Sequence, residues 1–308
     1  MDGLLIINKP RGWTSHDVVA KLRKILSIQK IGHTGTLDPD ATGVLTVCIG
    51  RATKLAQYTN EFDKEYKVVM KLGVSTDTLD ATGKVVKETK EFEVSTAQIE
   101  EAFKKFTGKI NQIPPMYSAV KVKGVPLYRH ARKGKEVSRE AREVNIKEIK
   151  FLEHSGEFVK FDVTCSKGTY IRTLCSDIGD LLGPGAHMFS LERTRSGEFS
   201  ISDAMTVEDA EGLNRSGNLM SRMKSLEQMT GWMPSVIINK RGYSLVRDGR
   251  PLDTGAIDEV KRDFFPEDTV AVADISGELK AIGKAICSSD EARHGSDKNV
   301  LKIERVLI

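Results

Sequence analysis

The sequence lacks the segments that direct a chain into a membrane. None of its apolar runs approaches the ~20 residues of a membrane-spanning helix. The N-terminal sequence holds only a short apolar run, over residues 3–7, and no small-residue cleavage site of a signal peptide follows it. We therefore expect a chain that does not enter a membrane and that works in the cytoplasm.

Cysteine is also scarce. The chain has four cysteines, and none of them forms a C-x-x-C pair. The spacing argues against a zinc site and against a disulfide framework. We expect Cys48, Cys165, Cys175 and Cys287 to be reduced core residues, as is usual in the cytoplasm.

The charge is small in total but unevenly distributed. The 308 residues carry 47 Lys and Arg against 43 Asp and Glu, a net charge of +4. Residues 1–60 carry +4 and residues 121–142 carry +6, which leaves −6 for the rest of the chain. Such separation indicates a surface that faces a polyanion, although a solvated lysine-rich helix would give the same pattern.

Strand and helix patterns interleave along the chain. Alternating or short apolar segments predict strands at 4–7, 44–49, 66–72 and 161–165, and periodic apolar residues behind capping boxes predict helices from Thr14 and Ser95, with a further helix at 169–182. The alternation favours an α+β fold with a mixed, mostly antiparallel sheet and helices packed on it. With about 150 residues per domain, two domains are expected.

The second domain is predicted from a change of pattern near Pro234. Residues 235–308 are rich in short strands and turns, and they carry a net charge of −1. We therefore divide the chain into a large domain over 1–234 and a small β domain over 235–308.

The segment 31–43 is the most unusual part of the sequence. It holds three glycines but neither a P-loop nor a dinucleotide-binding fingerprint, and its composition predicts a loop. Pro39 biases Asp38 towards extended backbone, which would hold its carboxylate out from the scaffold. An Asx turn, in which Asp38 only bonds the backbone, fits the same spacing.

This segment resembles the catalytic motif of the TruB family of pseudouridine synthases. Further family motifs follow in the expected order over about residues 3–200: Asn8-Lys9-Pro10 with Thr14-Ser15, Lys64-x-Tyr66, Pro114-Pro115-x-Tyr117-Ser118, Ser166 to Thr173, and Gly185-Ala186-His187 with Leu191. The C-terminal segment is similar to a PUA domain. The resemblance implies a pseudouridine synthase fold followed by a small β-barrel-like PUA domain.

The resemblance also implies roles for individual residues. Asp38 would be the catalytic nucleophile or base, Arg172 its carboxylate partner, and Tyr66 a residue that stacks on the flipped base and moves a proton. Physical chemistry supports the pairing, because a cation offsets the rise in pKa that burial causes in a carboxylate. The substrate-binding residues implied by the family positions are Lys9, Gly32, His33, Thr34, Gly35, Tyr170 and Leu191.

The implied substrate is tRNA. The family isomerises a T-loop uridine to pseudouridine without a cofactor or a metal, after the base has been flipped out. Residues 121–145 would form a thumb segment that grips the T arm through Lys121, Lys123, Arg129, Arg132 and Lys133. The PUA-like domain would contact the acceptor end, and we expect a monomer.

Three other functions fit parts of the sequence. A guide-RNA-dependent synthase shares the catalytic motifs, but this chain lacks lysine-rich tails. An RNA chaperone would bind tRNA without needing Asp38. A hydrolase or glycosidase is disfavoured because no second carboxylate has a convincing role. The sequence leaves open which step Asp38 performs.

Overall fold

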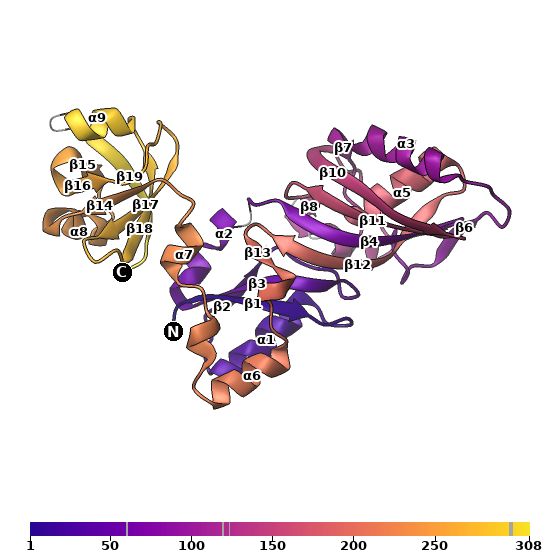
Figure 1. Cartoon of the computed structure of the whole chain (residues 1–308), viewed down its shortest axis with the longest axis horizontal. Helices are drawn as coiled ribbons and strands as arrows, with labels where there is room; N and C mark the ends of the chain where they lie inside the picture. Colours follow the sequence, from indigo (N-terminus) through magenta and orange to yellow (C-terminus); the bar gives the residue numbers. More distant parts are fainter. Residues whose placement is uncertain (60, 119, 123, 296–297) are drawn as a thin grey trace.

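The computed structural model describes residues 1–59, 61–118, 120–122, 124–295 and 298–308. Within these residues a nine-stranded sheet organises the first part of the chain (Figure 1). Its main path runs β1 (Gly3–Lys9), β3 (Thr42–Ile49), β12 (Ala186–Ser196), β4 (Lys64–Leu72), β11 (Phe158–Cys165), β10 (Arg142–Ser155) and β7 (Gly108–Gln112), while β2 (Ile31–Thr34) pairs with β3 and β13 (Phe199–Ser200) with β12. Among the described residues, β3 and β12 are the one parallel pair of strands in this sheet. The structure thus confirms the α+β fold with a mixed, mostly antiparallel sheet.

Helices cover this sheet in two places. The pair α3 (Thr96–Phe106) and α5 (Ile171–Leu182) packs against β10 and β12, and α1 (Ser15–Leu26) lies beside α6 (Val207–Arg215) next to β1 (Figure 1). Capping boxes begin α1 at Thr14 and α3 at Ser95, as the sequence predicts. The shorter elements here are α2 (Ala56–Thr59), α7 (Leu226–Thr230), β5 (Val74–Thr76) and β6 (Val85–Glu88).

The segment 31–43 is not wholly a loop. Residues Ile31–Thr34 form β2, because Ile31 to Thr34 pair in antiparallel register with Ile49 to Thr46. The neighbouring strand supplies the hydrogen-bond partners that offset the poor strand propensity of Gly32. The true loop covers residues 35–41.

The C-terminal part forms a second sheet of barrel-like shape. Its order is β15 (Leu252–Asp253), β19 (Asn299–Val306), β18 (Leu279–Ala285), β17 (Thr269–Asp274), β14 (Ser235–Ile238) and β16 (Ile257–Val260), with α8 (Lys240–Arg247) and α9 (Ser289–His294) beside it. It has an apolar core of its own. The expected boundary between residues 234 and 235 falls just before β14.

The two parts of the molecule are joined by direct contacts. One apolar cluster contains Leu4 and Val44 from the first sheet and Leu279 and Leu307 from the second. Arg51 Nη1 donates to the carbonyl oxygen of Leu307 at 2.8 Å, so the C-terminal end of the chain is anchored on the first sheet.

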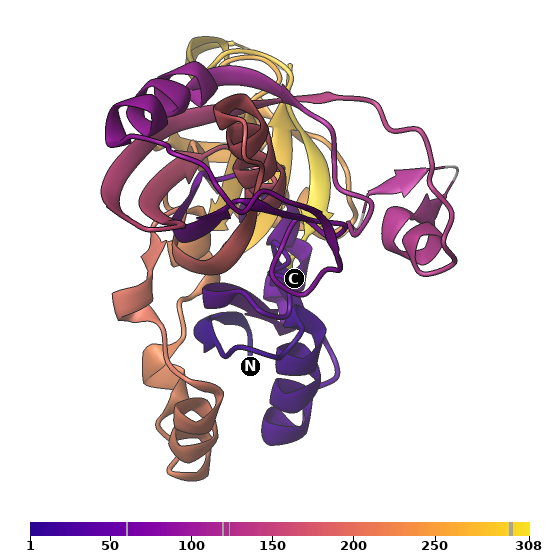
Figure 2. The ribbon, with the colours of Figure 1, turned by 90° about the vertical axis from the view of Figure 1, so that its right-hand side faces the viewer.

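The part of the thumb segment before β10 stands away from the body (Figure 2), whereas residues 142–145 belong to β10 and pair with β7 in the first sheet. It contains the two-residue strands β8 (Lys121–Val122) and β9 (Val125–Pro126) and the helix α4 (Leu127–Ala131), which is shorter than the basic helix suggested by the sequence. Across the described residues, no helix is both long and apolar enough to span a membrane.

Candidate active site

Asp38 lies in the loop between β2 and β3, and the loop is fastened from two sides. Ser15 Oγ, at the start of α1, accepts from the amide of Leu37 at 2.9 Å. Lys9 Nζ donates to the carbonyl oxygens of Pro39 at 3.0 Å, Trp13 at 2.6 Å and Pro10 at 3.0 Å. The carboxylate therefore projects from a fixed turn.

Arg172, in the first turn of α5, holds the Asp38 carboxylate through two bonds. Arg172 Nε lies 3.0 Å from Asp38 Oδ2, and Nη2 donates to Oδ1 at 3.1 Å. The guanidinium also donates to the carbonyl oxygens of Tyr117 at 2.8 Å and Thr78 at 3.3 Å. Its side chain is only 5% exposed, whereas that of Asp38 is 37% exposed, so the arginine is fixed from behind while the carboxylate faces outward.

The charges around Asp38 oppose one another. Burial raises the pKa of Asp38 above its usual value, and the Asp80 carboxylate raises it further. The Arg172 guanidinium and the Lys9 ammonium lower the pKa. These two cations therefore favour the ionised carboxylate that a nucleophile or base needs.

Asp80 is a site residue that the sequence analysis missed. Its Oδ2 lies 3.7 Å from Arg172 Nη1, and its Oδ1 accepts from Thr78 Oγ1 at 2.6 Å and from the amide of Thr82 at 3.0 Å. Arg172 thus stands between two carboxylates. The Thr78-x-Asp80-x-Thr82 pattern is typical of a turn in which an Asp side chain bonds nearby groups, and it was the sequence feature that could have indicated Asp80.

A hollow of about 130 Å³ opens beside Asp38. We call it the Asp38 hollow; its wall is formed by residues 38–41, 80–82 and 188–191 together with Arg11. Leu191 is therefore brought to Asp38, as the family pattern predicts. Within the described residues, no three His, Cys, Asp or Glu side chains converge in a way that could hold a metal ion.

Tyr66 is close to Asp38 but does not line the hollow. It is buried on β4, and burial raises its pKa to about 12. Arg193 lies opposite Tyr66 in the pairing of β12 with β4, and its guanidinium partly offsets this rise in the pKa of Tyr66. Arg193 is a second missed residue: it is almost fully buried and donates to the carbonyl oxygens of Val44 at 2.6 Å and Gly35 at 3.1 Å.

The other residues predicted around the base lie at several depths. His33, on β2 beside Gly32, is half-buried with its pKa lowered by burial, and its Nδ1 has no hydrogen-bond partner among the described residues. Thr34 is buried against Thr46 on β3. Tyr170 caps α5, where its amide donates to Gln112 Oε1 at 3.0 Å. None of these side chains lines the Asp38 hollow.

Lys9 and the thumb residues occupy opposite environments. Lys9 is fully buried with three carbonyl partners, which fits support of the active-site wall and not contact with RNA. Lys121, Arg129, Arg132 and Lys133 are exposed. Lys123 lies outside the described residues.

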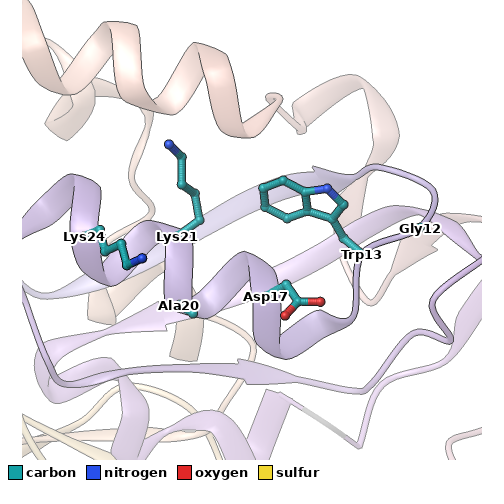
Figure 3. Close-up of a pocket in the computed structure, with 6 residues that line it drawn as sticks. All are labelled: Gly12, Trp13, Asp17, Ala20, Lys21 and Lys24. Atoms are coloured by element: carbon teal, nitrogen blue, oxygen red, sulfur yellow. The ribbon is translucent and has the colours of Figure 1, made fainter.

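A second and larger hollow, of about 340 Å³, lies along α1 and is shown in Figure 3. Trp13, Asp17, Lys21 and Lys24 line it. Asp17 closes the capping box of α1, and Lys21 pairs with Glu211 at 3.4 Å. Because Asp17 and Lys21 are engaged in the fold, we place the candidate active site at Asp38.

Comparison with known proteins identifies the family of the chain. The profile of the TruB family pseudouridylate synthase N-terminal domain matches residues 23–171, the tRNA pseudouridylate synthase B C-terminal domain matches 172–229, and the PUA domain matches 234–307. The chain is 41% identical to tRNA pseudouridine synthase B of Clostridioides difficile over 97% of this chain and 99% of that one, and 41% identical to that of Bacillus pumilus over 100% and 98%.

Solved structures agree. A chain of a Cbf5-Nop10-Gar1 complex superposes with a TM-score of 0.79 at 32% identity, covering 99% of this chain and 85% of that one. The family resemblance read from the motifs is therefore confirmed. The chain belongs to the TruB family of pseudouridine synthases and ends in a PUA domain.

Proposed function

We propose that this protein isomerises the T-loop uridine of tRNA to pseudouridine. The single observation that carries the proposal is the Asp38–Arg172 pair, whose carboxylate faces an open hollow while its guanidinium is buried. That hollow is smaller than the roughly 300–1,000 Å³ of sites that enclose drug-sized ligands, and a single flipped base is of the scale that it would hold.

The reaction requires only rearrangement within one nucleotide. The bond between C1′ of the ribose and N1 of uracil breaks, the base turns, and C1′ bonds to C5, which loses its proton while N1 gains one. Asp38 provides the carboxylate that acts on the nucleotide, and Arg172 keeps it ionised and oriented. Leu191 lines the Asp38 hollow and provides apolar surface that receives the base, while Tyr66 is buried close to Asp38.

The RNA is held by the parts around the site. The exposed cations Lys121, Arg129, Arg132 and Lys133 of the thumb segment contact phosphates of the T arm, and the PUA domain contacts the acceptor end. The protein works as a monomer in the cytoplasm on free tRNA. Support for stand-alone action comes from the 41% identity over nearly the full length of tRNA pseudouridine synthase B from two bacteria.

The test compares Asp38→Asn with wild-type protein. Asn keeps the side-chain shape and removes the charge, so pseudouridine formation on an unmodified tRNA transcript should be abolished while tRNA affinity stays within about tenfold. Asp40→Asn is the matched control, because Asp40 lines the same hollow but its carboxylate pairs with exposed Arg11. Turnover by Asp38→Asn would refute the assignment, and so would a wild-type protein that modifies only RNA presented with a guide RNA.

A further inference from the structure

An exposed aromatic side chain stands at the rim of the Asp38 hollow. Phe189 lines the hollow and is 45% exposed, although its neighbours Met188 and Leu191 are buried. Large exposed apolar side chains beside a binding site often belong to that site. None of the roles assigned above uses Phe189.

The backbone places Phe189 there by a β-bulge. In the pairing of β12 with β4, Met188 faces Met70 and Ser190 faces Val69, so Phe189 is an extra residue without a partner. A bulge beside an active site redirects a side chain away from the regular alternation of the strand. Here it turns an aromatic ring out of the sheet while Leu191 keeps its buried position.

Two neighbours support the ring. Phe158, on β11, contacts Phe189 edge to face, with 5.0 Å between ring centroids and 65° between ring planes. Lys71 Nζ lies 5.7 Å from the centroid of Phe158 and pairs with Glu157 at 3.0 Å. We call Phe189, Phe158 and Lys71 the rim platform. An aromatic face beside a cation suits an unpaired nucleobase and its phosphate, because bases stack on aromatic rings while lysine contacts the backbone.

We propose that the rim platform binds an unpaired nucleobase of the RNA adjacent to the target uridine, with Phe189 as the stacking surface. The site is continuous with the Asp38 hollow, so a nucleotide next to the flipped uridine reaches it without leaving the protein surface. This inference rests on the proposed function. It adds a second base site outside the one that holds the reacting uracil.

The test measures steady-state pseudouridine formation on a T-arm stem-loop RNA with Phe189→Leu and Phe189→Tyr. Leucine keeps apolar volume and removes the aromatic face, so kcat/KM should fall about tenfold, a size typical of one lost stacking contact. Tyrosine should stay within twofold of wild type. Leu152→Ala is the control, because Leu152 is 46% exposed on the same sheet but does not line the hollow.

A second RNA set identifies the contact. Stem-loops with one abasic nucleotide on either side of the target remove the base itself, and on one of them wild type and Phe189→Leu should become equal. Equal activity on the intact RNA, or an undiminished difference on both abasic RNAs, would overturn the proposal. With 2-aminopurine at the same position, the fluorescence of this base should be quenched when the RNA binds wild-type protein but not when it binds Phe189→Leu. This readout does not depend on catalysis. Quenching without pseudouridine formation would therefore refute only the proposed function.

Discussion

Replacing Arg172 by lysine tests whether the geometry of the guanidinium, and not only its charge, sustains catalysis. Arg172 bonds both oxygens of Asp38, at 3.0 and 3.1 Å, and also the carbonyl oxygens of Thr78 and Tyr117. A lysine ammonium is a point charge with three donors and cannot reproduce the planar fork. The variant therefore keeps the charge next to Asp38 and loses its alignment.

The expected magnitude follows from the number of bonds. A hydrogen bond to a charged group contributes about 1.5–3 kcal/mol, so weakening both Asp38 contacts removes about 3 kcal/mol or more of orientation. Since about 1.4 kcal/mol corresponds to tenfold in rate, the single-turnover rate of pseudouridine formation should fall by roughly 10²-fold or more. The affinity for tRNA should change little, because Arg172 is buried behind the carboxylate.

The control is Arg195→Lys. Arg195 is on β12 and pairs with Glu65 on β4, and both side chains are 37% exposed, so the pair contributes little in water. Its rate should stay within twofold of wild type, and thermal melting should show that both variants are folded. A rate for Arg172→Lys within fivefold of wild type would refute the argument that the fork positions Asp38.

Three further substitutions test neighbouring groups. Asp80→Asn keeps an acceptor oxygen but removes a negative charge that raises the pKa of Asp38, so the pKa of Asp38 should fall. The acid limb of the pH profile of kcat should then move to lower pH, and an unchanged acid limb would contradict this. Burial lowers the pKa of Lys9 from 10.5 to about 8, so between these pH values the unfolded chain binds a proton that the folded chain does not. The free energy of unfolding should therefore rise over this pH range by about 3 kcal/mol more in the wild-type protein than in Lys9→Met. The same pH dependence of the unfolding free energy in both proteins, measured by denaturant titration, would refute this. Arg193→Lys should lower kcat about tenfold without changing tRNA affinity, because the loop that carries Asp38 loses the bond from Arg193 to the carbonyl oxygen of Gly35. A change in affinity alone would argue against a positioning role.

Local features of the fold could be predicted from the sequence. The capping boxes at Thr14 and Ser95 start their helices where expected, because the signal lies within four residues. The alternating strand at 66–72 likewise depends only on its own side chains. In contrast, β2 at Ile31–Thr34 was expected to be loop, since its strand conformation is imposed by β3 and not by its own composition.

The site could be predicted only where a family motif reported a long-range contact. Asp38 and Arg172 are 134 positions apart, and the resemblance alone joined them before the structure did. Asp80 and Arg193 were missed because neither is unusual in its local sequence; their importance comes from what packs against them. The bulge at Phe189 depends on the register between β12 and β4, which no local pattern encodes.

The charge of a sequence segment also does not show which of its cations are exposed in the fold. Residues 1–60 were expected to face a polyanion, yet Lys9, Arg23, Arg51 and Lys54 all donate to carbonyl oxygens of the protein itself. Arg51 and Lys54 use these bonds to anchor the PUA domain, so their charges serve assembly of the fold. The net charge of a sequence segment counts such residues as surface charge, because the sequence does not distinguish a cation bonded to backbone from one in solvent. The cations of the thumb segment are exposed, so under the proposed function we expect them to contribute more of the attraction for RNA than the cations of residues 1–60.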